Sequence, residues 1–162
     1  RETSYLGTGS DNSGQLRIYD KQGETRSYLG DGYLQAYNQF GERTIFLGTG
    51  TNGGGYLRTY NFSGQESIYV GTGADSSGQI RIYDNTGETG SFLGSGYFRT
   101  YNRFGKMTTF IGNATDGGGY LRTNNKFETE TAFLGTNNAN EGLINLNDKF
   151  GQSFWIRLNK KN

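Results

Sequence analysis

Residues 48–71 read GTGTNGGGYLRTYNFSGQESIYVG, which is one complete copy of a unit that the rest of the chain repeats. The copy starts at a glycine, passes through a glycine-rich link into the alternating run Tyr56-Leu57-Arg58-Thr59-Tyr60, and turns at Gly64. Alternation with a period of two is typical of a β-strand with two distinct faces. The stretch therefore predicts two strands connected by a link and a tight turn.

The copies can be counted from the glycines that follow an aromatic and an aliphatic residue. These are Gly7, Gly30, Gly48, Gly71, Gly94, Gly112 and Gly135, with spacings of 23, 18, 23, 23, 18 and 23. Each position recurs 64 residues later, which indicates a duplicated block of three units. We predict a single repeat domain over 1–162, with units ending near residues 23, 41, 64, 87, 105, 128 and 151. Residues 152–162, with Trp155, form a C-terminal cap or continue into further chain.

The turns follow a second pattern, Asx-x-x-Gly, at the end of each unit. Asn or Asp at the first position and glycine at the fourth predict a type I turn followed by a left-handed glycine. Only Glu128 departs from the pattern, because it stands where glycine is expected. We predict that this turn is distorted.

Composition excludes several classes of site. The hydrophobic fraction is 31%, below the roughly 45–50% of an ordinary globular domain, so a thick core is not expected. The chain has no cysteine and no histidine, which removes the usual ligands of zinc, copper and iron. A net charge of +1 gives no general attraction to nucleic acid or membranes. We expect no metal site, no cofactor, no nucleic-acid partner, no membrane insertion and no enzymatic activity.

Each unit is too short to bury its own aliphatic row, so the fold must bury that row against something else. One arrangement is a single-chain β-solenoid with one unit per rung. The other is three chains whose aliphatic rows meet on a common axis. Roughly two aliphatic residues per strand make a thin face, and this favours the trimer. The predicted fold class is thus all-β, a repetitive elongated β-helix or β-prism fibre of seven two-stranded units, with the solenoid as the alternative.

The run Tyr-Leu-Gly, polar link, Gly-Tyr-Leu-Arg-x-Tyr-Asn-x-x-Gly resembles the repeats in shafts of phage tail fibres and related bacterial surface fibres, many of which are trimeric. The resemblance covers about residues 3 to 151. It implies an extended structural or attachment role and supplies no catalytic residue.

Two sets of residues are candidates for ligand contact. Tyrosine and arginine alternate on one face of the second strands, where they either stack as structural ladders or bind sugar rings and acidic groups. The long links between strands are the other candidates, because they are the freest part of each unit. The candidate contacts are Tyr56, Arg58, Tyr60, Tyr97, Arg99, Tyr101, Asn52, Asp75 and Asp116.

The sequence therefore predicts a non-enzymatic structural protein that forms a fibre shaft or extracellular filament with a role in surface attachment. Its partners would be copies of itself, as a homotrimer or filament, and a cell-surface glycan. The alternative is a lectin-like, carbohydrate-binding repeat module. Either role places the chain outside the cell, at a cell surface or on a virion.

Overall fold

The computed structural model describes residues 2–51, 53–115, 117–137 and 139–158, and for residues 155–158 it describes only the backbone. The described residues contain strands and turns but no helix, which confirms the predicted all-β, repetitive class. The chain divides into an N-terminal unit, Arg1–Gly87, and a C-terminal unit, Glu88–Asn162. The boundary falls at Gly87, the end of the fourth repeat.

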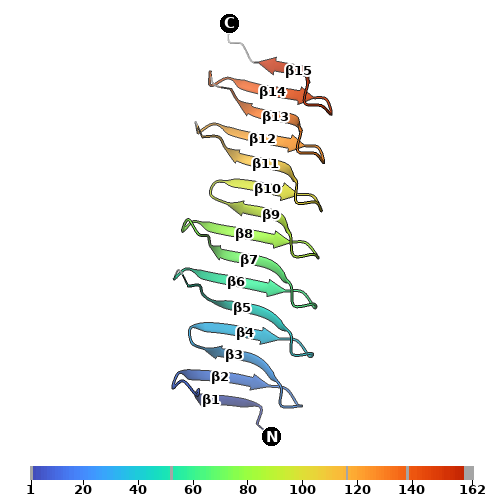
Figure 1. Cartoon of the computed structure of the whole chain (residues 1–162). Coiled ribbons are helices and arrows are strands. Elements are labelled where there is room, and N and C mark those ends of the chain that lie inside the picture. Colours follow the sequence, from blue (N-terminus) through green and yellow to red (C-terminus); the bar gives the residue numbers. More distant parts are fainter. Residues whose placement is uncertain (1, 52, 116, 138, 159–162) are drawn as a thin grey trace. The chain divides into compact units, whose positions relative to one another are not determined.

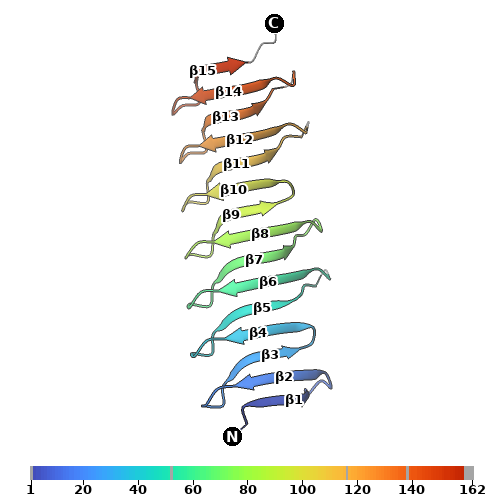
Figure 2. The same ribbon diagram turned by 180° about the vertical axis from the view of Figure 1, so that it is seen from behind.

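The N-terminal unit is an antiparallel meander in which each strand pairs with its neighbours in sequence (Figure 1). The Asx-x-x-Gly turns join the strands at one of their ends and the links join them at the opposite ends, as the reverse view also shows (Figure 2). Its strands are β1 (Ser4–Thr8), β2 (Gly14–Tyr19), β3 (Thr25–Gly30), β4 (Tyr33–Tyr37), β5 (Arg43–Thr49), β6 (Gly55–Tyr60), β7 (Glu66–Thr72) and β8 (Gly78–Tyr83).

The C-terminal unit repeats the same meander. The backbone of its last strand pairs with β14, whereas the side chain of Trp155, predicted as a cap, lies outside the described part of the chain. Its strands are β9 (Thr89–Gly94), β10 (Tyr97–Tyr101), β11 (Met107–Asn113), β12 (Gly119–Asn124), β13 (Glu130–Thr136), β14 (Gly142–Asn147) and β15 (Ser153–Leu158).

Antiparallel pairing corrects one expectation. In a single-chain β-solenoid each unit forms a rung that lies parallel to the next, but within both units successive strands pair antiparallel. The physical reason is the length of the connections, because tight turns join antiparallel neighbours and a parallel pair needs a crossover. Each unit is an open, single-layer sheet, and the solenoid alternative describes neither of them.

The turns explain the short connections. In the turn that starts at Asn38, the N–H of Gly41 donates to the Asn38 carbonyl at 3.1 Å, and the Asn38 side-chain oxygen accepts from Phe40 and Glu42. The glycines of this type have φ between 70° and 92°, so the predicted type I turn with a left-handed glycine is confirmed.

The prediction of a distorted turn at Glu128 is wrong. Glu128 adopts φ 66° and donates to the Asn125 carbonyl at 3.0 Å, as glycine does in the equivalent turns. The side chain stabilises this conformation, because Lys106 Nζ lies 3.0 Å from a Glu128 carboxylate oxygen and the Met107 N–H donates to the other oxygen at 3.3 Å.

The links take two forms. In the 18-residue repeats, the link between the two strands has two residues at positive φ, Asp31-Gly32 and Ser95-Gly96. This is the type I′ turn favoured in hairpins. Long units close with a wider hairpin turn, as where Gly9 donates to the Ser13 carbonyl at 2.7 Å. The extra five residues of a 23-residue repeat therefore lengthen a hairpin loop. They do not form the corner between two sheets that a solenoid would need.

Strand alternation gives each unit two different faces. One, the aliphatic face, carries directly paired aliphatic residues. In the N-terminal unit these are Leu6, Leu16, Leu29, Leu34, Leu47, Leu57, Val70 and Ile80, and in the C-terminal unit Leu93, Ile111, Leu121, Leu134 and Ile144, with the aromatic Phe98 in the equivalent place on β10. The other, the polar-aromatic face, carries the tyrosines, phenylalanines and arginines. Among described residues the only buried hydrophobic side chain is Phe110, so neither unit has a conventional core.

Candidate functional site

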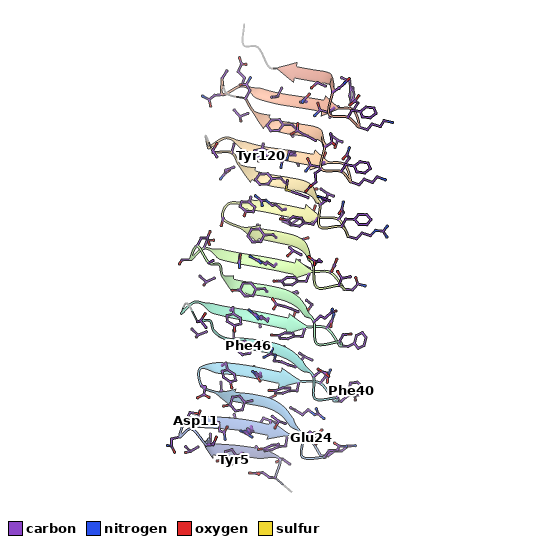
Figure 3. The ribbon with its side chains drawn as sticks, in the orientation of Figure 1. Tyr5, Asp11, Glu24, Phe40, Phe46 and Tyr120 are labelled. Atoms are coloured by element: carbon purple, nitrogen blue, oxygen red, sulfur yellow. The ribbon has the colours of Figure 1, made fainter. Side chains whose placement is uncertain are left out.

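A continuous row of aromatic rings, the aromatic ladder, runs along the polar-aromatic face of each unit. In the N-terminal unit Tyr28, Tyr33, Phe46, Tyr56 and Tyr69 follow one another with ring centroids 5.2 to 5.8 Å apart. Phe46, at the middle of this ladder, is labelled in Figure 3. In the C-terminal unit the equivalent ladder is Phe92, Tyr97, Phe110, Tyr120 and Phe133, at 4.6 to 5.6 Å. Six of these eight ring pairs are stacked and two are tilted. Aromatic pairs in favourable geometry add about 0.5–1.5 kcal/mol per pair beyond burial.

The glycine that closes each first strand makes room for the ladder. Gly71 is the cross-strand partner of Tyr56. A Cβ at Gly71 would lie 2.5 Å from the Tyr56 Cβ and 2.8 Å from the Gly55 carbonyl oxygen. A side chain at this position would therefore displace a ring or the backbone, so the glycines that mark the repeat have a packing role.

Arginines lie over the rings, as the alternation of tyrosine and arginine predicts. The guanidinium carbon of Arg58 lies 4.7 Å from the Tyr56 centroid, and that of Arg99 lies 4.2 Å from the Tyr97 centroid. Each cation–π contact is worth about 0.5–1 kcal/mol at an exposed site. Most of the tyrosine and arginine columns are therefore accounted for by contacts within the sheet.

One part of this face is hollowed. A recess of about 620 Å³ in the N-terminal unit brings together β6, β7 and β8 with the two long links beside them. It is lined by Gly50, Thr51, Tyr56, Arg58, Glu66, Tyr69, Thr72, Gly73, Ala74, Gln79, Arg81 and Tyr83. We call it the β6–β8 recess.

The β6–β8 recess places a carboxylate among cations and phenols. Arg58 Nε lies 3.4 Å from a Glu66 carboxylate oxygen. Burial is the largest influence on Arg58 and disfavours its charged form, but the Glu66 charge, the hydrogen bond with Tyr60 and the charges of Tyr56 and Tyr60 together outweigh it, so the pKa of Arg58 is raised. Burial, and then the Glu66 charge, raises the pKa of Tyr83 above its usual value. The recess thus offers ring faces together with hydrogen-bond donors and acceptors, a combination found in small-molecule binding sites.

The duplicated block does not keep this chemistry. Sixty-four residues after Gln79, Arg81 and Tyr83 stand Leu143, Asn145 and Asn147. Tyr69 is likewise replaced by Phe133, so the equivalent place in the C-terminal unit lacks one of the two cations and two of the three phenols of the recess. A site that differs from its repeat is a better candidate for recognition than one that merely recurs.

The predicted contact residues fall into four groups. Tyr56 and Arg58 line the β6–β8 recess, and Tyr60 lines a smaller hollow of about 300 Å³ with Tyr37 and Arg43. Tyr97 and Arg99 lie in the ladder of the C-terminal unit, and Tyr101 pairs with Met107 at its edge. Asp75 lies in a long link, where its carboxylate accepts hydrogen bonds from the N–H and hydroxyl of Ser77. Asn52 and Asp116 lie outside the described residues.

Sequence reasoning missed Glu66 and Gln79 in the recess. Glu66 is the first residue of β7 and pairs across the sheet with Tyr60. Simple alternation along the strands does not predict this pair, because the register shifts at a bulge between Thr59 and Tyr60. It also missed the exposed phenylalanines at the hairpin turns.

No group of three acidic, histidine or cysteine side chains that could hold a metal ion occurs within residues 2–51, 53–115, 117–137 and 139–158. In the same described residues no helix is long and apolar enough to cross a membrane. No protein-family model matches the chain, and the search of curated proteins finds no significant relative.

Proposed function

We propose that this chain is a non-enzymatic structural protein that assembles with copies of itself through the aliphatic face, as a homotrimer that forms a shaft or filament outside the cell. One observation carries the proposal. The aliphatic face runs through every strand from β1 to β8 in the N-terminal unit, and six of the eight aliphatic side chains named for it are exposed while the other two are half-buried. Leu29 is 49% exposed and Leu47 is 51% exposed. Contiguous exposed apolar surface of this kind marks interaction sites.

The exposed area supports the same proposal. A compact protein of 17.9 kDa exposes roughly 8,000 Å², whereas this chain exposes 10865 Å². The excess is several times the roughly 800 Å² that each partner contributes to a standard interface.

The shape of the aliphatic face also suits a partner. A hollow of about 630 Å³ lies among Leu29, Leu34, Leu47, Leu57 and Val70. The second row of this face carries smaller residues at several places, such as Ala36 and Thr59, opposite larger ones on neighbouring strands. Three such thin faces around one axis require little volume, which favours three copies over two.

The mass in solution tests this proposal. Light scattering coupled to gel filtration should give about 54 kDa, three times the 17.9 kDa of one chain. The double variant Leu29→Glu/Leu47→Glu places two charges on the aliphatic face and should give a single chain. Phe40→Glu/Phe62→Glu is the matched control, because both rings lie at exposed turns, and it should keep the native mass. A single-chain mass for the unmodified protein would refute self-assembly.

A second candidate function is carbohydrate binding, which the β6–β8 recess supports. Arg81→Asn introduces the residue that the C-terminal unit carries at the equivalent position. In a screen of cell-surface glycans this variant should lose a signal that the native protein gives. Arg99→Asn, on the same kind of face but outside the recess, should retain it. Equal signals from both variants would exclude the recess as the site.

A further inference from the structure

Three consecutive hairpin turns of the C-terminal unit present a cation next to an exposed phenylalanine. The pairs are Arg103-Phe104, Lys126-Phe127 and Lys149-Phe150, and the rings are 65%, 74% and 73% exposed. In each pair the cation lies 4.7 to 4.9 Å from the ring centroid. These six residues, the basic-aromatic edge, lie on the turns between β10 and β11, β12 and β13, and β14 and β15.

The basic-aromatic edge is specific to the C-terminal unit. The three turns that stand 64 residues earlier read Asn38-Gln39-Phe40-Gly41, Asn61-Phe62-Ser63-Gly64 and Asp84-Asn85-Thr86-Gly87. They contain two exposed phenylalanines but no cation. Turn formation needs only the Asx and the left-handed residue, so the turn itself does not explain the added cations.

Side-chain contacts also connect the three turns to one another. Asn125 Nδ2 donates to the Lys149 carbonyl at 3.1 Å and ties the second turn to the third. The Lys106–Glu128 ion pair, at 3.0 Å, ties the first to the second. Successive turns are two strands apart, which spaces equivalent backbone positions of the turns by about 9.5 Å.

A cleft opens between the second and third turns. Its volume is about 670 Å³, and Asn125, Lys126, Phe127, Thr129, Lys149 and Phe150 line it. Two ring surfaces, two ammonium groups and polar turn atoms therefore surround one space. Each cation is adjacent to an apolar ring, so an occupant must offer negative charge and an apolar surface together.

We propose that the basic-aromatic edge binds a linear acidic polysaccharide, with sugar rings packed against the phenylalanines and carboxylates paired with the cations. The even spacing fits a polymer that carries charge at every sugar or every second sugar. Duplex DNA carries one charge per about 1.7 Å, which is far denser than these cations. Insertion into a membrane would draw the ammonium groups that lie on the rings toward hydrocarbon, which is costly. The inference goes beyond self-assembly and does not depend on it.

Binding to immobilised polygalacturonate, measured by biolayer interferometry with the full chain, tests the proposal. We expect salt-sensitive binding to polygalacturonate and none to neutral dextran. Phe127→Ala/Phe150→Ala leaves every charge in place and should weaken binding about tenfold, since it removes two ring contacts. Phe40→Ala/Phe62→Ala removes two turn phenylalanines of the N-terminal unit that are at least as exposed, and should leave binding unchanged.

A charge pair of variants separates specific binding from general attraction. Lys126→Gln should weaken binding, whereas Lys21→Gln, at the same turn position but followed by Gln22, should not. An unchanged melting temperature and mass confirm that each variant is folded and assembled. The proposal would be overturned if variants of the two units lost equal amounts of polygalacturonate binding, or if the protein bound dextran. It would also be overturned if duplex DNA or phosphatidylglycerol vesicles bound more tightly than polygalacturonate.

Discussion

Glu128 shows how one side chain can compensate for an unfavourable backbone conformation. A left-handed conformation costs a residue other than glycine roughly 1–2 kcal/mol, and Glu128 adopts it at φ 66°. Its carboxylate reaches the preceding turn, where it accepts from Lys106 and from the Met107 N–H. The residue therefore joins two turns that glycine would leave separate.

Stability should depend on pH through Glu128. The hydrogen bond from Lys106, followed by that from Met107, holds the pKa of Glu128 below its usual value of 4.5. A lowered native pKa means that the contribution is present above the unfolded pKa and is lost as the pH falls through the native pKa. The melting temperature of the native protein should therefore exceed that of Glu128→Gln at pH 7, and the difference should disappear in acid.

A double-mutant cycle provides the control for this prediction. In a Lys106→Met background, Glu128→Gln should have a smaller effect at pH 7, because the two residues act together. A difference that stays constant from pH 7 to below the native pKa would show that Glu128 acts through its backbone conformation alone.

Much of the residue-scale structure could be predicted from the sequence. The Asx-x-x-Gly pattern predicts the turns because it reports directly on local backbone conformation. It fails at Glu128 because the stabilising partner, Lys106, belongs to a different turn, 22 residues away. The exposed pairs such as Lys126-Phe127 were missed for a similar reason, because the variable turn positions carry no periodic signal.

At the scale of strands, the glycines and rings form one packing unit. Period two predicts the two faces of each strand but not the seating of a ring against a glycine on the next strand. The sequence therefore marks Gly71 only as a recurring position of the repeat, and its packing against Tyr56 is visible only in the cross-strand register. The regular pairing of Tyr with Gly, also seen for Tyr97 and Gly112, is the signal that could have revealed it.

Gly71→Ala should disrupt the ladder of the N-terminal unit. The added Cβ has no room beside Tyr56, so we expect a loss of about 1–3 kcal/mol in the free energy of unfolding, measured by urea denaturation. Gly78→Ala is the matched control, since a Cβ there meets nothing within 4 Å, and it should change stability by no more than about 0.5 kcal/mol. If both variants lost the same free energy of unfolding, Gly71 would matter only for its backbone conformation and not for the packing of Tyr56.

At the scale of the molecule, the sequence predicted strands and repeats but could not decide how the strands pair. A five-residue link is compatible with a corner of a solenoid and with a wide hairpin, and period two is the same in both. Hydrogen bonds within the links, such as Gly50 to Gly54 at 2.8 Å, decide for the hairpin. The expectation of a thin core was closer, because Phe110 is the only buried hydrophobic side chain among the described residues.

If copies of the chain cover the aliphatic face, thermal stability must depend on concentration. Assembly stabilises the folded state by mass action, so the melting temperature should rise with protein concentration. Leu29→Glu/Leu47→Glu should abolish that dependence and lower the melting temperature. A native melting temperature that is independent of concentration over a hundredfold range would contradict assembly through this face.

The single-layer sheet also bears on how such a chain can change over evolutionary time. In an ordinary domain a face of a sheet packs against a second layer, so a substitution on that face constrains the elements that cover it. Among the described residues each unit is a single layer of strands, so no second layer of the same unit covers either face. Substitutions on opposite faces should therefore be additive in stability. A lineage could rework the surface that meets one partner, residue by residue, without having to readjust the surface that meets another.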